Sequence, residues 1–343
     1  MSVRMVCVGA VLAAAGCGSA PAQSSPHDSS DGGASAPRST SNGPPAPSSP
    51  PASAPDAGDV PDALASNVSE PDGDGAAGDG AEGGGAGTAC VTGKVTPDEV
   101  VMLGDSYFDP VWANTALDLF ADAQNAGALA ANVTYRHYYI GAASMAWGNP
   151  GTQFYIPYQY DPMAKTDTAV TNPKDIKVVI TDGGGNDVLI GDTTCEQTAP
   201  PGNASCTMTV QNAIAKAQSM LQEMASDGVE SIVYVFYPHL DPAGGGILAM
   251  PAPSVNETLA YAYPLAENIC CGSAFTSTAT NYSCSGKPIP SSNTKCVFVD
   301  TRPAFEGHVA DYIKSDHVHP TPAGAQVIAD LVWNAMKANC IAQ

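Results

Sequence analysis

The chain has 343 residues and carries 34 acidic against 13 basic side chains, a formal net charge of −21 at neutral pH. This balance excludes nucleic acid as an expected partner, because such binding needs clustered Lys and Arg side chains. It also argues against electrostatic docking on anionic lipid. A charge of this size favours a dispersed, exported protein.

Residues 1–17 have the layout of an export signal. Arg4 precedes an apolar run that is too short for a stable membrane span. The run ends in a segment that resembles a bacterial lipoprotein cleavage box, although Ala14 stands where leucine is usual, three residues before Cys17. We therefore expect an exported protein. It is either a lipoprotein at the cell surface or in the periplasm, anchored in the membrane through Cys17, or a plain secreted protein.

Residues 18–88 are predicted to be a disordered, acidic linker. The segment consists mainly of Ser, Pro, Ala, Gly and Asp. It contains ten acidic residues and one basic residue, Arg38. With almost no large apolar side chains, this stretch cannot bury enough surface to offset its ordering entropy. The remaining residues, 89–343, are the size of one larger domain.

Strands and helices alternate along this domain. Continuous apolar runs predict strands, and apolar residues three or four apart predict helices. The predicted strands are 100–103, 133–140, 176–181, 231–237 and 296–300, and the predicted helices are 111–125, 207–227 and 322–338. This alternation predicts a parallel, three-layer α/β domain.

Two segments do not follow the alternation. Residues 147–160 hold four Phe and Tyr side chains without clean periodicity, and they form either a cover over the core or a platform for substrate. Residues 240–295 are rich in Gly, Pro, Ser, Thr and Cys, and are too long for an ordinary connection. We interpret them as a Cys-rich insertion that is cross-linked by disulfides and covers the site.

Eight cysteines follow residue 88, and an even number in an exported chain predicts disulfides, here up to four. Cys195 and Cys206 flank a turn-rich loop and are expected to close it. Four others are expected to cluster in a second loop: Cys270, Cys271, Cys284 and Cys296. Cys90 is then left to pair with Cys340. A zinc site is the alternative, but there is no Cys-x-x-Cys pair and no histidine at ligand spacing, so no metal is expected.

Polar residues follow several of the predicted strands. Ser106 comes after the first strand, Gly141 and Asn186 come after two others, and Asp316 and His319 precede the last helix. Acyl transfer from an ester needs a nucleophile, a base, a group that orients the base, and donors for the oxyanion. Ser106 can be the nucleophile, His319 the base and Asp316 its partner. The backbone N–H groups of Ser106 and Gly141, with the Asn186 amide, can bind the oxyanion.

At these residues the chain resembles the SGNH hydrolase family, also called GDSL-type esterases and lipases. The four blocks stand in the family's order: Gly104-Asp105-Ser106, Gly141, Gly184-Gly185-Asn186-Asp187, and Asp316 to Pro320. Tyr107 departs from the leucine or isoleucine that often follows the serine. The resemblance implies a flavodoxin-like α/β/α sandwich with about five parallel strands. It also implies hydrolysis of carboxylic esters without a cofactor.

Several alternatives stay open at this point. Asn186 and Asp187 could cap a helix, Asp316 and His319 could form a surface turn, and His317 with His319 could bind a metal. The expected partner is an ester, with short acyl groups such as acetyl on a carbohydrate as the first choice. The second is a lipase, lysophospholipase or thioesterase substrate with a longer chain. A non-catalytic surface-binding module of the same fold is the alternative from another class.

Overall fold

The computed structural model describes residue 90 and residues 94–241, 252–271, 287–288 and 292–342. The predicted export signal and linker lie outside the described residues. The strands form one sheet in the order β2-β1-β3-β4-β6-β5. Their bounds are β1 Val100–Leu103, β2 Arg136–His137, β3 Val178–Thr181, β4 Ser231–Phe236, β5 Lys287–Pro288 and β6 Lys295–Asp300. Five strands are parallel and only β5 is antiparallel, which confirms the predicted class.

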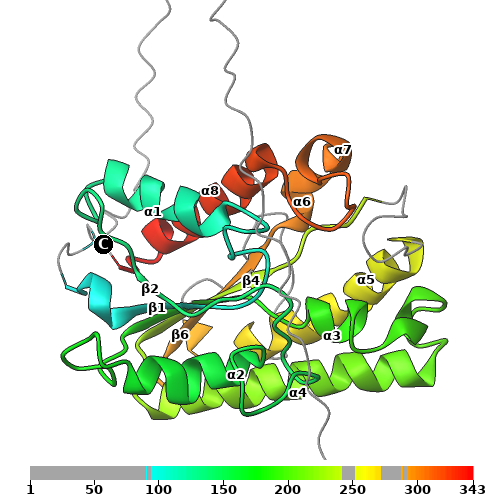
Figure 1. Cartoon of the computed structure of the whole chain (residues 1–343), viewed down its shortest axis with the longest axis horizontal. Coiled ribbons are helices and arrows are strands. Elements are labelled where there is room, and N and C mark those ends of the chain that lie inside the picture. The colour runs from blue at the N-terminus through cyan, green and yellow to red at the C-terminus, as the bar shows by residue number, and fades with distance from the viewer. Residues whose placement is uncertain (1–89, 91–93, 242–251, 272–286, 289–291, 343) are drawn as a thin grey trace, which may run out of the picture. The chain divides into compact units, whose positions relative to one another are not determined.

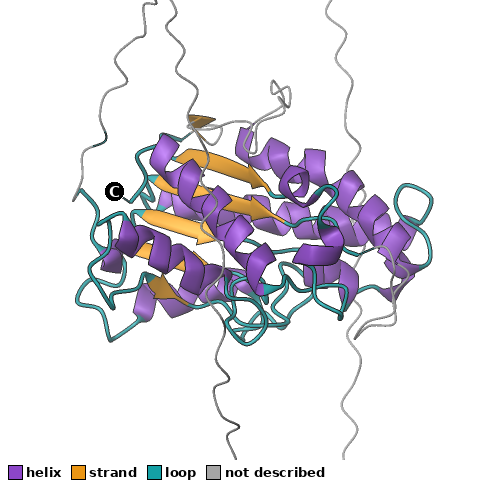
Figure 2. Cartoon of the chain, turned by 90° about the horizontal axis from the view of Figure 1, so that it is seen from above, coloured by secondary structure: helices purple, strands orange, loops and turns teal. Residues whose placement is uncertain are grey.

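Helices cover both faces of the sheet (Figure 1). Helices α1 (Thr115–Asn125) and α8 (Pro322–Ala338) pack together on one face, while α4 (Ala204–Ser226) and α5 (Ala252–Cys271) pack together on the other. Figure 2 shows the strands side by side between these layers. Shorter turns complete the described chain: η1 (Pro97–Glu99), α2 (Ile156–Tyr158), η2 (Gln159–Met163), η3 (Ala164–Thr166), α3 (Gly185–Leu189), η4 (Thr193–Glu196), α6 (Arg302–Phe305) and α7 (Val309–Tyr312).

The central strands are apolar throughout because both of their faces are covered. Every residue of β1, β3 and β4 is buried. Counted along the five parallel strands, the sheet order is 2-1-3-4-5, the flavodoxin-like order. Its switch point lies between β1 and β3, where neighbouring connections leave in opposite directions. Ligands of such sheets bind at the carboxyl ends of the strands at this point.

Most predicted elements are present with shifted ends. Helix α8 has the predicted bounds, whereas α1 begins four residues late because Asp109 holds the preceding residues in turns. Strand β2 is two residues long instead of eight. The chain beyond it still runs beside β1, since Tyr138 N and Ile140 N donate to the carbonyl groups of Met102 and Gly104.

The predicted insertion contains a helix. Helix α5 lies within 240–295, while 242–251 and 272–286 are outside the described residues. The disulfides Cys195–Cys206 and Cys90–Cys340 are confirmed. A third disulfide joins Cys270 to Cys296. The expectation that both of these cysteines lie in one loop was wrong, because Cys270 is in α5 and Cys296 is in β6; Cys284 lies outside the described residues.

The aromatic segment 147–160 divides into two parts. Tyr160 is fully buried and packs in the core, so this side chain is part of a cover. Trp147 and Phe154 are 56% and 44% exposed. Among the residues that the structure describes, no helix combines the length and apolarity that a membrane span requires.

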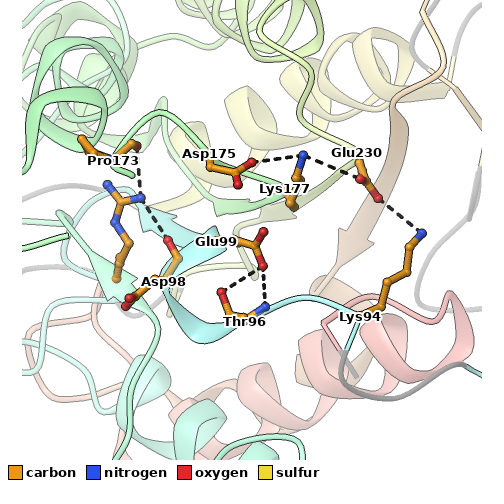
Figure 3. Close-up of polar contacts among 9 residues, drawn as sticks. Lys94, Thr96, Asp98, Glu99, Pro173, Asp175, Lys177 and Glu230 are labelled. Carbon is orange, nitrogen blue, oxygen red and sulfur yellow. Dashed lines mark hydrogen bonds and ion pairs between the residues drawn. The ribbon is translucent and has the colours of Figure 1, made fainter. Parts of the chain in front are cut away.

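Exposed polar pairs hold the edge of the sheet where the strands begin (Figure 3). Lys94 Nζ lies 3.5 Å from Glu230 Oε2, and Lys177 Nζ lies 3.1 Å from Asp175 Oδ1. Such pairs contribute little individually. They connect the segment before β1 to the residues that precede β3 and β4, at the edge opposite the candidate site.

Candidate functional site

The turn after β1, residues 104–107, carries Ser106, the nucleophile predicted from the sequence, and is called the nucleophile turn below. Gly104 has φ +140°, and a Cβ there would lie 1.9 Å from Asp182 Oδ1. The buried Gln159 amide accepts a hydrogen bond from Gly104 N at 2.7 Å and donates one to Gly104 O at 2.9 Å. The turn therefore requires glycine at 104 and is fixed by side chains from two other segments.

Asp105 is a buried hydrogen-bonding centre beneath the serine. Its backbone N–H donates to Asp182 Oδ1 at 2.9 Å, and its carboxylate accepts from Tyr107 N at 3.1 Å and Tyr237 Oη at 2.6 Å. Burial raises the pKa of Asp105 to about 6, although the bonds from Tyr237 and Tyr107 oppose the shift. Burial, followed by the charge of Asp105, raises the pKa of Asp182 well above its ordinary value. Asp182 Oδ2 is buried and has no hydrogen-bond partner among the described residues.

Ser106 presents both of its polar groups without a partner. The residue is 6% exposed. Neither its backbone N–H nor its hydroxyl forms a hydrogen bond within the described part of the chain. Both groups are therefore available to a ligand that enters at the carboxyl end of β1.

Residues 314–320, the histidine loop, hold Asp316 and His319 as a bonded pair. His319 Nδ1 lies 2.8 Å from Asp316 Oδ2, and Asp316 Oδ1 accepts the N–H groups of Val318 and His319 at 3.0 and 2.9 Å. Burial alone would raise the pKa of Asp316, but these bonds outweigh it and lower the pKa. Burial lowers the pKa of His319 against the opposing effect of Asp316. His319 is therefore neutral at pH 7 and can accept a proton.

Two aromatic side chains bring the histidine loop to the nucleophile turn. Tyr107 Oη donates to Val318 O at 2.7 Å, and the Tyr107 ring lies 6.4 Å from the His319 ring. Trp112 stacks on His319 at 4.8 Å between centroids, with 24° between the planes. Within the residues that the structure describes, no hydrogen bond joins Ser106 Oγ to His319. Catalytic hydrogen bonds commonly shorten only when substrate binds.

The three predicted oxyanion donors are placed differently. The Ser106 N–H has no hydrogen-bond partner among the described residues. Asn186 Nδ2 donates to Ala143 O at 2.8 Å and to Asp105 Oδ2 at 3.3 Å, so it lies against the nucleophile turn. Gly141 N–H already donates to Asp109 Oδ2 at 2.7 Å.

Residue 142 was not predicted from the sequence. Ala142 is exposed, has φ +63°, and its N–H forms no hydrogen bond within the described residues. An alanine at positive φ carries no sequence signal, because glycine and asparagine are the residues expected there. Gly141 has a packing role instead, since a Cβ at this position would lie 2.4 Å from Trp112 Nε1.

The neighbours of the predicted site residues have structural partners. The carboxylate of Asp187 accepts the backbone N–H groups of 145–147, each at 2.7 Å, and so holds the loop that follows Ala142. His317 Nδ1 lies 2.7 Å from Asp241 Oδ2. Among the described residues, no three His, Cys, Asp or Glu side chains gather as metal ligands.

Comparison with known proteins gives structural neighbours only. No family model and no curated protein matches the chain. It is similar to a protein classed as a GDSL-like lipase from Parabacteroides merdae, with 17% identity, TM-score 0.42, and 69% of this chain and 94% of that chain covered. It is also similar to BT4096, a gut microbial diltiazem-metabolizing enzyme, with 16% identity and TM-score 0.46, over 73% of this chain and 49% of that one. A third neighbour is TesA, with 15% identity and TM-score 0.41, over 70% of this chain and 98% of that one. One of these structural neighbours is classed as a GDSL-like lipase, the family that the sequence blocks resemble.

Proposed function

We propose that this chain is a serine hydrolase of the SGNH kind, which cleaves carboxylic esters through an acyl-enzyme on Ser106. The observation that supports this most directly is the Asp316–His319 pair, held beside the turn that bears Ser106, whose hydroxyl has no hydrogen-bond partner among the described residues. The pair and the serine lie at the switch point of a flavodoxin-like sheet, where such folds bind ligands.

In the proposed mechanism, His319 Nε2 takes the proton of Ser106 Oγ as the oxygen forms a bond to the ester carbonyl carbon. The C–O bond to the alcohol then breaks, and His319 returns the proton to the leaving oxygen. Water next gives a proton to His319 and attacks the acyl carbon. The Ser106 oxygen leaves, takes the proton back, and the carboxylic acid is released.

The negative oxygen of each tetrahedral intermediate needs donors that point at it. We assign this role to the N–H groups of Ser106 and Ala142 and to Asn186 Nδ2, each worth about 3 kcal/mol of barrier. Ala142 replaces Gly141 in this assignment, since Asp109 occupies the Gly141 N–H. Asn186 would exchange its 3.3 Å contact with Asp105 for the oxyanion.

The substrate proposed here is an ester of a short acyl group, such as acetyl, on a carbohydrate. Trp112 is 36% exposed and stacks on His319, so its ring lies beside the space that the leaving alcohol would occupy and can pack against a sugar. Lipase, lysophospholipase or thioesterase action on longer chains is the alternative. The three disulfides are typical of an oxidising, extracytoplasmic compartment; export and a lipid anchor on Cys17 remain part of the proposal.

Covalent labelling tests this function. The folded chain should react with a fluorophosphonate at Ser106 and hydrolyse p-nitrophenyl acetate. Ser106→Ala should lose the label and about a thousandfold or more of the hydrolysis, with an unchanged circular dichroism spectrum. An unlabelled, inactive wild-type chain would favour the non-catalytic binding module, and turnover retained in Ser106→Ala would exclude Ser106 as the nucleophile.

A further inference from the structure

A small apolar cavity opens beside Ser106. Its free volume is about 20 Å³. Besides Asp105, Ser106, Asn186 and the two tyrosines Tyr107 and Tyr237, its wall is hydrocarbon from α3, α5, the segment after β4 and the histidine loop. The apolar lining side chains are Val188, Leu189, Leu240, Val255, Leu259 and Val318. We call this space the front cavity.

The front cavity suits the acyl side of an ester. The leaving alcohol must lie beside His319, which returns the proton to it, and neither His319 nor Trp112 lines this cavity. A volume of about 20 Å³ is near the room that one water molecule needs. A methyl group is of similar size, whereas a sugar ring cannot enter. The front cavity therefore fits the methyl of an acetyl group.

A second cavity of about 30 Å³ lies behind the first, between α3, α4, α5 and the sheet. We call it the rear cavity. Four residues line both spaces: Gly185, Val188, Tyr237 and Leu259. Within α5, Val255 lines only the front cavity, Leu259 lines both, and Ala262 and Ala266 line only the rear one. These spacings place the four side chains in a row along one face of the helix.

We propose that Leu259 sets the upper limit on acyl chain length by closing the front cavity from the rear cavity. The inference rests on the proposed esterase function. Of the four shared residues, Tyr237 supports the nucleophile turn through its bond to Asp105. Gly185 and Val188 belong to the short helix that carries Asn186. Only Leu259 comes from α5, so its side chain can be changed without altering the elements that hold Ser106 and Asn186.

The experiment measures kcat/KM for p-nitrophenyl acetate, butyrate, hexanoate and octanoate. For the wild-type chain we expect a drop of about a hundredfold or more between acetate and butyrate, because butyrate adds two methylenes and each misplaced methylene costs about tenfold or more in a closed apolar pocket. Leu259→Ala removes the partition and joins the two cavities. It should raise the hexanoate-to-acetate ratio by about tenfold or more.

Three control variants distinguish the joining of the two cavities from a general loosening of the site. Leu259→Ala combined with Ala262→Leu refills the rear cavity and should restore the wild-type profile, while Ala262→Leu alone should leave acetate hydrolysis unchanged. Val255→Ala enlarges only the front cavity, so it should improve butyrate but not hexanoate. Circular dichroism and thermal unfolding check the fold. If Leu259→Ala does not fold, Leu259→Val opens a narrower connection between the two cavities. It should raise the ratio of kcat/KM for butyrate to that for acetate.

The outcomes distinguish this inference from the function on which it rests. Absence of hydrolysis and of fluorophosphonate labelling in the folded wild-type chain would overturn the esterase proposal. A wild-type chain that hydrolyses octanoate as well as acetate would overturn the size limit alone. So would a folded Leu259→Ala variant that hydrolyses acetate and keeps the wild-type chain-length profile.

Discussion

The nucleophile turn and the histidine loop are held by different kinds of contact. The nucleophile turn is buried, and side chains from other segments, Gln159, Asp182 and Tyr237, bond its backbone or its aspartate. The histidine loop is partly exposed and is held by its own Asp316, by the contact of His317 with Asp241, and by two aromatic residues, Tyr107 and Trp112. The position of Ser106 is thus fixed by the core of the fold, while the orientation of the His319 ring depends on a few contacts. Changes in the turn should reduce stability, and changes in the loop should mainly reduce activity.

The largest effect is expected in the nucleophile turn. Gly104→Ala should lower the free energy of unfolding by at least about 3 kcal/mol, because the new methyl group displaces Asp182 from its bond to Asp105 N at a strained φ. Urea unfolding measures it. Gly228→Ala is the matched control: φ is +91° there, but nothing lies within 4 Å of the added Cβ. It should cost only about 1 kcal/mol. Equal costs would show that the turn is not tightly enclosed.

In the histidine loop, Asp316→Asn should reduce kcat by about a thousandfold and leave the unfolding midpoint nearly unchanged. The amide oxygen can still accept the backbone N–H groups of Val318 and His319. It no longer stabilises the imidazolium that forms when Ser106 loses its proton. Ester hydrolysis and thermal unfolding of the same preparation check both parts. A loss of stability as large as that of Gly104→Ala would contradict the contrast between the two regions.

The contact between the two regions should have an intermediate effect. Tyr107→Phe removes the hydroxyl that binds Val318 O and keeps the ring, so kcat/KM should fall about tenfold, as for one lost hydrogen bond. Tyr135→Phe is the control, because the Tyr135 hydroxyl is buried and has no hydrogen-bond partner among the described residues. It should not lower activity. An unchanged kcat/KM in Tyr107→Phe would mean that the histidine is aimed without this bond.

A smaller effect is expected on the pH profile. Activity should rise with pH as His319 loses its proton, with a midpoint below 6.5 because burial lowers its pKa. Trp112→Leu uncovers one face of the imidazole, so the midpoint should move to higher pH. Trp147→Leu removes another exposed indole, one that packs against Gly191, and should leave the midpoint in place. A shift to lower pH in Trp112→Leu would mean that the indole mainly stabilises the imidazolium.

The smallest effect concerns the pH dependence of stability. The pKa of Asp182 is raised in the folded chain, so its contribution is fully present below the unfolded value of 3.8 and is lost as pH rises through the folded pKa. In Asp182→Asn the side chain at this position does not titrate, and its amide oxygen can still accept the hydrogen bond from Asp105 N. Its thermal midpoint should therefore fall less than that of the wild type between pH 4 and pH 8. Parallel curves would show that Asp182 does not titrate in this range.

The fold could be predicted wherever local signals and burial agree. Helix α8 has the predicted bounds because Pro322 stands in its first turn, the Thr321 hydroxyl accepts Gly324 N, and apolar residues recur on one face. Helix α5 was missed. Its sequence contains Pro264 and is flanked by segments typical of loops, while its packing on α4 and its disulfide to β6 depend on residues far away in the chain.

The candidate site could be predicted as a set of residue types but not as a geometry. The blocks around Ser106, Asn186 and His319 lie at one edge of the sheet because parallel strands end there. The free donor at Ala142 instead of Gly141 follows from a backbone angle that no local pattern encodes. Tyr107, which departs from the family pattern, bonds a carbonyl 211 positions later in the chain.

The Cys90–Cys340 disulfide also has a mechanical consequence. It lies near Lys94 and Ile341, on the side of the domain where the strands start, away from Ser106. Tension applied through the segment that precedes Cys90 would be shared with the end of α8 instead of passing along β1 alone. A domain pulled at that point would therefore bear the load at the end of the sheet opposite Ser106.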